Sequence, residues 1–356
     1  MEKTNLEVKT NRNVTLDYLR VFAMFMVVFD HIVFMRRPEW IGTKLADYAF
    51  FKPLSIIQWS GAFGVCIFFL LTGYLFIPSF KRKQTGIVGS IRFTLRKLLS
   101  LWLPCICAFA FFFVFQKIVG MITPAGRYWW QFSIKDWIES STLVSFFIGS
   151  YDKINITWFL IPLVIFYIFY AQLQHIRIRE KYNCIIYIGG VLTMYALGKL
   201  FSKIPFFVCC AHYSWFVTLI LAGIILYQVK SNLISKRWGT VLLFMNYCTT
   251  LLGLYLYDKQ YLLNEPYLVS FIYSVMLFIM LPKLEFKPNR VVSFFADISF
   301  SVYLLHMCVG GLVLSLLVSK MRFTFAVCIT LITTILFCTI FCYLVEKPIR
   351  QLLRRL

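Results

Sequence analysis

Long apolar stretches recur along the whole chain of 356 residues. Each stretch holds roughly twenty residues, the length that an α-helix needs to cross about 30 Å of bilayer hydrocarbon. No sizeable soluble domain fits between them, so the pattern predicts one all-α membrane domain over residues 1–356. The expected bundle has about ten spans: Leu16–Met35, Leu54–Ile77, Leu98–Val119, Trp158–Leu173, Cys184–Phe201, Trp215–Val229, Val241–Leu256, Tyr267–Leu281, Phe294–Val318 and Phe323–Leu344.

The Lys and Arg residues between the spans predict the orientation of the bundle. The N-terminal tail (residues 1–13), the even-numbered loops and the C-terminal tail together hold 22 of these residues, whereas the opposite loops and the span ends beside them hold 13. Cytoplasmic loops of membrane proteins carry the excess of cations. We therefore expect both termini in the cytoplasm, with Val345–Arg350 as the end of the last helix.

The longest loop on the opposite side, residues 120–156, has the pattern of a helix that lies on the membrane surface. Trp129, Trp130 and Trp137 suit the membrane–water interface. Ser133 followed by Asp136 is typical of a helix N-cap. Such an interfacial helix would either cover the outer mouth of the bundle or only anchor it, and the sequence leaves both interpretations open.

Composition supports a membrane protein and excludes several other classes. Sixty per cent of the residues are hydrophobic and 14% are charged, whereas soluble domains are about half apolar and a quarter charged. The net charge of +21 is spread over short loops, where it faces anionic membrane lipids rather than nucleic acid. The eleven cysteines lie mostly in apolar stretches without a zinc-ligand spacing, so we expect neither disulfides nor a metal.

Four ionisable residues in the first predicted span point to function: Asp17, Arg20, Asp30 and His31. A charged side chain costs about 2.5–3.5 kcal/mol at the middle of the bilayer. Arg20 and His31 are about three helical turns apart, so they share one face and are separated by roughly 16 Å. Such a face would line a passage with a fixed cation at one end and a proton-transferring imidazole at the other. Alternatively, Arg20 pairs with Asp17 and His31 satisfies a nearby carbonyl, while Asp30 points about 100° away from His31 and is not its expected partner.

A second candidate site lies at the start of the third span. Arg92 and Arg96 are four residues apart and share a helix face, with Lys97 beside them. Guanidinium groups bind phosphates through paired hydrogen bonds, so this cluster is a candidate site for a phosphorylated cosubstrate. The alternative is a purely topological role beside lipid headgroups.

Polar residues also mark the ninth span, where Asp297, Ser301, Tyr303 and His306 form a stripe. These side chains are expected either to bind substrate or to form interhelical hydrogen bonds, and for Ser301 we favour the structural role. In the second span, three glycines predict either close packing between helices or close approach of a ligand to the backbone: Gly61, Gly64 and Gly73.

Taken in order along the chain, these segments resemble the acyltransferase-3 family of membrane O-acyltransferases. The first span is similar to the family's Leu-Asp-x-Leu-Arg string followed eleven residues later by His, here Leu16–Arg20 and His31. Other similar strings are Phe68–Tyr74, the basic segment leading to Pro104, Trp158–Leu160 and Ser301–His306. Two positions depart from the pattern: Ser100 stands where many members have a second Arg, and Thr157 stands where many have a His.

The resemblance implies an enzyme that takes an acyl group from cytoplasmic acyl-CoA, with acetyl-CoA as the expected donor. The implied acceptor is a hydroxyl of a surface or lipid-linked glycan outside the bacterial cytoplasmic membrane. His31 is then the expected general base, and Arg20 is expected to contact the donor. Arg92, Arg96 and Lys97 would bind the CoA phosphates, and Trp158, Tyr303 and His306 would bind substrate. The alternative class is a transporter or flippase for a lipid-linked or anionic substrate, which predicts inverted halves with matching broken helices.

Overall fold

The computed structural model describes residues 13–34, 44–45, 48–49, 60–81, 86–122, 133–147, 157–170, 172–173, 179–263 and 267–355. Over these ranges the chain is helical and contains no strand. Seven helices of this described part are long and apolar enough to cross a membrane, and two shorter apolar helices cover Thr157–Phe169 and Tyr267–Met280. The predicted all-α membrane fold is therefore confirmed. The count of ten spans and the cytoplasmic location of both termini stay predictions, and nearly all of the tail 1–13 lies outside the described residues.

The helical elements, in chain order, are α1 (Val14–Phe29), η1 (Asp30–Phe34), α3 (Ser60–Lys81), α4 (Gly86–Ile122), α6 (Ile134–Thr142), α7 (Val144–Phe147), η3 (Thr157–Phe159), α8 (Leu160–Ile165), η4 (Phe166–Tyr170), α9 (Glu180–Leu200), α10 (Pro205–Lys230), α11 (Lys236–Tyr257), α12 (Lys259–Leu263), α13 (Tyr267–Met280), η6 (Leu281–Lys283), α14 (Arg290–Leu305), η7 (His306–Gly310), α15 (Gly311–Leu317), α16 (Phe323–Phe341), η8 (Cys342–Glu346) and α17 (Lys347–Arg355). Four of the η segments, η1, η4, η7 and η8, are π-helical turns that continue an α-helix.

Two helices begin ten or more residues earlier than the apolar pattern predicts. The predicted span Leu98–Val119 is only part of α4, whose 37 residues begin at Gly86. Similarly, α10 begins at Pro205 rather than at the predicted Trp215. Proline fits the first helical turn because its missing N–H would have no partner there. The basic segment of residues 92–97 is therefore helical, which fixes the direction of each of its side chains.

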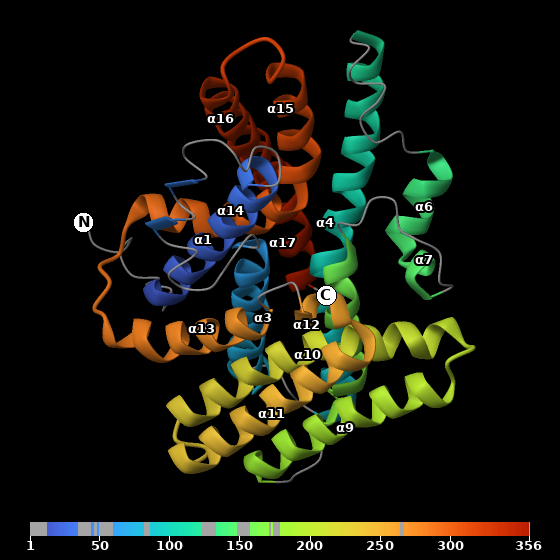
Figure 1. Cartoon of the computed structure of the whole chain (residues 1–356), viewed down its shortest axis with the longest axis vertical. Helices are drawn as coiled ribbons and strands as arrows, with labels where there is room; N and C mark the ends of the chain where they lie inside the picture. Colours follow the sequence, from blue (N-terminus) through green and yellow to red (C-terminus); the bar gives the residue numbers. More distant parts are fainter. Residues whose placement is uncertain are drawn as a thin grey trace, which may run out of the picture.

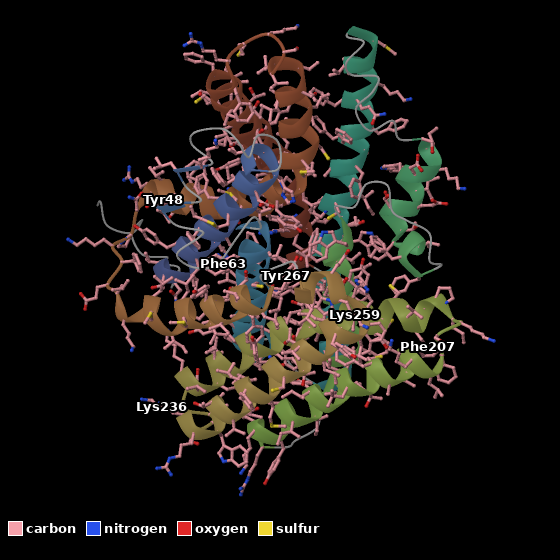
Figure 2. The ribbon with its side chains drawn as sticks, in the orientation of Figure 1. Tyr48, Phe63, Phe207, Lys236, Lys259 and Tyr267 are labelled. Carbon is pink, nitrogen blue, oxygen red and sulfur yellow. The ribbon has the colours of Figure 1, made fainter. Side chains whose placement is uncertain are left out.

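The helices form two groups that meet in the middle of the molecule (Figure 1). Helices α9, α10 and α11 lie side by side across the lower part of the view, whereas α4, α15 and α16 run along its vertical axis. Helix α10 packs tightly on α3, and α1 packs on both α3 and α14. The buried side chains of Phe63 and Tyr267 lie among those that fill the centre of the bundle, whereas exposed Lys236 lies at its edge (Figure 2).

Glycines permit the close contact between α3 and α10. A Cβ atom added to Gly73 would lie 1.8 Å from the carbonyl oxygen of Ile220, and one added to Gly223 would lie 2.0 Å from that of Leu70. Gly64 similarly faces the backbone of Ala23 on α1, at 2.5 Å from an added Cβ. The predicted packing role of glycine in the second span is confirmed at these positions, since no larger residue fits there without moving a helix.

The helix predicted in the loop 120–156 is present as α6. The Ser133 side chain accepts a hydrogen bond from the backbone N–H of Asp136 at 3.1 Å, and the Asp136 carboxylate accepts one from the N–H of Ser133 at 2.8 Å. The indole N–H of Trp102 on α4 donates to the carbonyl of Ser141 at 2.5 Å, which fastens the end of α6 to the bundle. Whether α6 covers an outer mouth stays a prediction, and the other tryptophans of this loop, Trp129 and Trp130, lie outside the described residues.

Candidate active site

A cavity of about 700 Å³ lies between α3, α4, α8, α14 and α17, a volume typical of sites for small molecules and cofactors. Each helix contributes one face, because the lining residues recur every three or four positions. On α3 these residues are Val65, Phe68, Phe69, Leu71, Thr72, Leu75 and Phe76. On α8 and its flanking turns they are Phe159, Leu163 and Tyr167, and α1 contributes Arg20.

One end of the cavity is strongly basic. The described lining contains six cationic side chains and two acidic ones, Asp297 and Glu346. The cations are Arg20, Arg96, Lys97, Lys347, Arg350 and Arg354. Helices α4 and α17 supply most of them and pack against each other. The excess of cations favours a ligand with several negative charges, and guanidinium groups match the geometry of phosphate oxygens.

The acid Glu346 is held in place by two neighbours. Its side chain is buried, Arg350 lies 2.7 Å from its Oε1 atom, and Ser301 on α14 donates a short hydrogen bond to Oε2. The structural role expected for Ser301 is thus observed, since its hydroxyl joins α14 to η8, the turn before the last helix. Asp297, the other acid, lies 3.9 Å from the ammonium of Lys347.

The other end of the cavity is aromatic. The ring of Tyr303 on α14 lies 4.8 Å from the ring of Phe159 and 6.0 Å from that of Phe68, measured between centroids, and both contacts are edge-to-face. The lining of α14 ends at Tyr303. One helical turn farther along the same helix is His306, whose ring centroid lies 6.0 Å from that of Tyr303.

His306 contacts His31 directly, although 275 residues separate them in the chain. Nε2 of His306 lies 3.0 Å from Nδ1 of His31. Nδ1 of His306 lies 3.0 Å from the carbonyl oxygen of Val302 and 2.8 Å from that of Tyr303. The sequence left the partner of His31 open, and the structure supplies one. The side chain of Asp30 lies against Gly61 on α3 and is buried.

Both histidines lie where an α-helix changes into a π-helical turn. His31 belongs to η1, which follows α1, and His306 opens η7, which follows α14. Glu346 closes a third such turn, η8. π-Helical turns are rare and are often found at functional sites, because the extra residue in the turn redirects the side chains.

The structure brings some of the predicted site residues together and separates others. Arg20, Arg96, Lys97 and Tyr303 line the cavity. Arg20 also forms the ion pair with Asp17 that was the alternative interpretation, at 3.2 Å. Arg92 is exposed and is not among the described residues that line the cavity. The cavity therefore gives no evidence for the predicted contact of Arg92 with phosphates.

Trp158 and the two histidines lie near the cavity but outside its described lining. Trp158 packs against Phe216 and Phe69, with ring centroids at 4.8 Å and 6.4 Å. The expected passage past Arg20 to His31 stays a prediction, because the described lining includes Arg20 and Tyr303 but neither histidine.

Sequence reasoning missed the contribution of the last helix. Lys347, Arg350 and Arg354 of α17 line the cavity with Glu346, whereas Val345–Arg350 was interpreted only as a helix end. The spacing of Arg350 and Arg354, four residues apart on one face, was the available signal.

Comparison with known proteins gives one result. The family model of the acyltransferase-3 family, described as an acyltransferase domain, matches residues 13–343. The match includes the histidine pair and ends just before Glu346 and α17. No curated protein and no solved structure matches the chain.

Proposed function

The chain belongs to the acyltransferase-3 family of integral membrane proteins, and on that premise we propose that it transfers an acetyl group from cytoplasmic acetyl-CoA to a glycan hydroxyl. The acceptor is a cell-surface or lipid-linked glycan at the outer side of the bacterial cytoplasmic membrane. The observation that supports this proposal is the order of groups along one path: a basic cavity end, an aromatic end, and then the His31–His306 pair.

The basic end suits the nucleotide part of coenzyme A, which carries a diphosphate and a further phosphate. Arg96 and Lys97 on α4 and Arg350 and Arg354 on α17 surround this end of the cavity and would bind these groups. The narrow pantetheine arm would then lie along the apolar face of α3 towards Tyr303. The charged donor thus stays on one side while only its acyl end reaches the interior.

The reaction itself requires a base near the thioester. His31 removes the proton from the acceptor hydroxyl while the hydroxyl oxygen attacks the thioester carbonyl carbon. The carbon–sulfur bond then breaks, and the CoA thiolate leaves and takes up the proton held by His31. General base catalysis of this kind contributes about 10²–10⁴-fold to the rate. The thioester would pass Tyr303, the last lining residue of α14, on its way to His31.

The test is a comparison of two single variants in cells and in purified protein. His31→Ala should abolish acetyl esters on the surface glycans, as measured by mass spectrometry, while the purified variant still binds labelled acetyl-CoA saturably. Arg96→Ala should weaken that binding. Undiminished acetylation by His31→Ala would refute the catalytic assignment, and a lack of saturable acetyl-CoA binding to the unmodified protein would favour a transporter.

A further inference from the structure

The polar contacts of His306 determine which of its nitrogens carries hydrogen. Its Nδ1 atom faces two backbone carbonyl oxygens, those of Val302 and Tyr303, at 3.0 Å and 2.8 Å. Carbonyl oxygens only accept hydrogen bonds. Nδ1 therefore carries a hydrogen and donates it to these oxygens. The side chain is buried, with 3% of its surface exposed, so water does not compete for this nitrogen.

This assignment fixes the tautomer of the neighbouring histidine. A neutral imidazole has one N–H group and one nitrogen with a lone pair. With the hydrogen on Nδ1, Nε2 of His306 is the acceptor, and it lies 3.0 Å from Nδ1 of His31. Nδ1 of His31 must then donate, so the lone pair of His31 is on Nε2, the nitrogen that points away from His306.

The packing around the pair holds the two rings in this geometry. Gly310 lies one turn beyond His306, and a Cβ atom added there would lie 2.7 Å from Cδ1 of Ile32 and 3.0 Å from Oγ1 of Thr334. Ile32 follows His31 in the chain, so the absence of a side chain at Gly310 lets η1 approach η7. The two π-helical turns contact each other directly.

We propose that His306 is a positioning residue that fixes the tautomer and the ring orientation of His31, leaving Nε2 of His31 as the atom that receives the proton of the acceptor hydroxyl. The inference rests on the proposed function and changes the expected role of His306, which was substrate binding. When Nε2 of His31 takes the proton, the resulting imidazolium keeps its Nδ1–H bond to His306. His306 in turn donates to the two carbonyl groups, whose dipoles stabilise the positive charge. The arrangement follows the general pattern of a catalytic base oriented by a third group.

Two amide variants of different length provide the test. The amide oxygen of His306→Gln reaches the position of Nε2 and accepts the hydrogen bond from His31. The amide of His306→Asn is one methylene shorter, so it still bonds the nearby carbonyls but does not reach His31. We expect His306→Gln to retain kcat within about tenfold and His306→Asn to lose about 10²–10⁴-fold, because the Asn side chain no longer selects the tautomer of His31.

The assay measures release of free CoA from acetyl-CoA by purified protein in lipid nanodiscs, with extracted surface glycan as acceptor. The KM for acetyl-CoA should stay unchanged in both variants, and the unfolding temperatures of the two should be similar. A substrate-binding role for His306 would instead raise KM in both variants. A purely structural role would lower the unfolding temperature and kcat of both together. Either result overturns the proposal, as does equal kcat in the Gln and Asn variants.

A third measurement separates this proposal from the proposed function. In the His31→Ala background, adding His306→Asn should cause no further loss of the residual rate, because the residue that His306 positions is already absent. If His31→Ala abolishes transfer while His306→Asn leaves kcat unchanged, only the positioning role fails. If His31→Ala transfers acetyl normally, the proposed function itself fails.

Discussion

Two arginines one turn apart on α4 have different surroundings. Arg96 lines the cavity, whereas Arg92 is exposed and, within the described chain, outside the lining. A hydrogen bond to a charged group contributes about 1.5–3 kcal/mol, which corresponds to a change of about 10- to 150-fold in affinity. The substitution Arg96→Gln should therefore weaken acetyl-CoA binding by about that factor.

Arg92→Gln is the matched control for this prediction, since it removes the same charge from the same helix. It should change the dissociation constant less than about threefold, because the exposed charge acts only through screened, long-range attraction. Binding of labelled acetyl-CoA to the two purified variants provides the measurement. Equal weakening by both substitutions would mean that the donor binds on the outer surface of α4 instead of in the cavity.

Ser301 allows a second prediction, on stability. Its hydroxyl is the donor to the buried carboxylate of Glu346. Ser301→Ala leaves that carboxylate with one donor fewer, and we expect a loss of about 1–3 kcal/mol in the free energy of unfolding. Ser299→Ala is the control, because Ser299 is also buried on α14 but donates only to the carbonyl of Ala296 in its own helix.

Thermal unfolding of both serine variants in detergent would check this difference. The Ser301 variant should unfold at a lower temperature than the unmodified protein. The unfolding temperature of the Ser299 variant should be close to that of the unmodified protein. Similar curves for both would show that Arg350, at 2.7 Å from Glu346, is sufficient to stabilise the buried charge.

At the residue scale, the sequence predicted which residues belong to the site better than it predicted which of them contact one another. Arg20, Arg96, Lys97 and Tyr303 were predicted from their positions and do line the cavity. The contact between His31 and His306 was not predicted, because the spacing within one helix carries no information on which helix packs beside it. The π-helical turns at both residues depend on tertiary packing and are not visible in the pattern of hydrophobic residues.

At the scale of the helix, the contact of α3 with α10 gives the third prediction. A Cβ atom at Gly73 would lie 1.8 Å from the carbonyl oxygen of Ile220, a distance that forces the two helices apart. Gly73→Ala should therefore lower the unfolding temperature markedly and reduce the yield of folded protein. Van der Waals packing is a main source of helix association in a membrane, and small residues make that packing close.

Gly189 on α9 provides the control, since an added Cβ there meets no atom within 4 Å. Gly189→Ala should leave stability unchanged or raise it by up to about 1 kcal/mol through helix propensity. Both variants would be compared by thermal unfolding in the same detergent. A Gly73→Ala protein as stable as the Gly189→Ala protein would contradict the close packing of α3 on α10.

The elements themselves were predicted more reliably than their ends. Apolar stretches located the membrane helices because the hydrocarbon thickness fixes their length. The starts of α4 and α10 were placed too late because charged residues and a proline were interpreted as loop signals. In α4 the polar residues Arg96 and Lys97 instead face an internal cavity, an environment that the one-dimensional pattern does not distinguish from the membrane surface.

At the scale of the whole molecule, the last helix relates the cavity to the orientation of the chain. Arg350 and Arg354 line the basic end of the cavity, and the C-terminus follows directly after α17. The basic end of the cavity and the C-terminus therefore lie close together, near the middle of the view in Figure 1. Acetyl-CoA is a cytoplasmic metabolite, so the proposed function requires a cytoplasmic C-terminus, in agreement with the distribution of Lys and Arg.

The fourth prediction tests that orientation with reporter fusions. A reporter that is active only in the cytoplasm should be active when fused after Leu356. The same reporter inserted between α15 and α16, in residues 318–322, should be inactive, because the single apolar span Phe323–Arg355 separates this turn from the C-terminus. The opposite pattern would direct the basic end of the cavity away from the cytoplasm and its acetyl-CoA. In that case the six cations of the lining would bind an external anion, and the donor proposed here would have no route to His31.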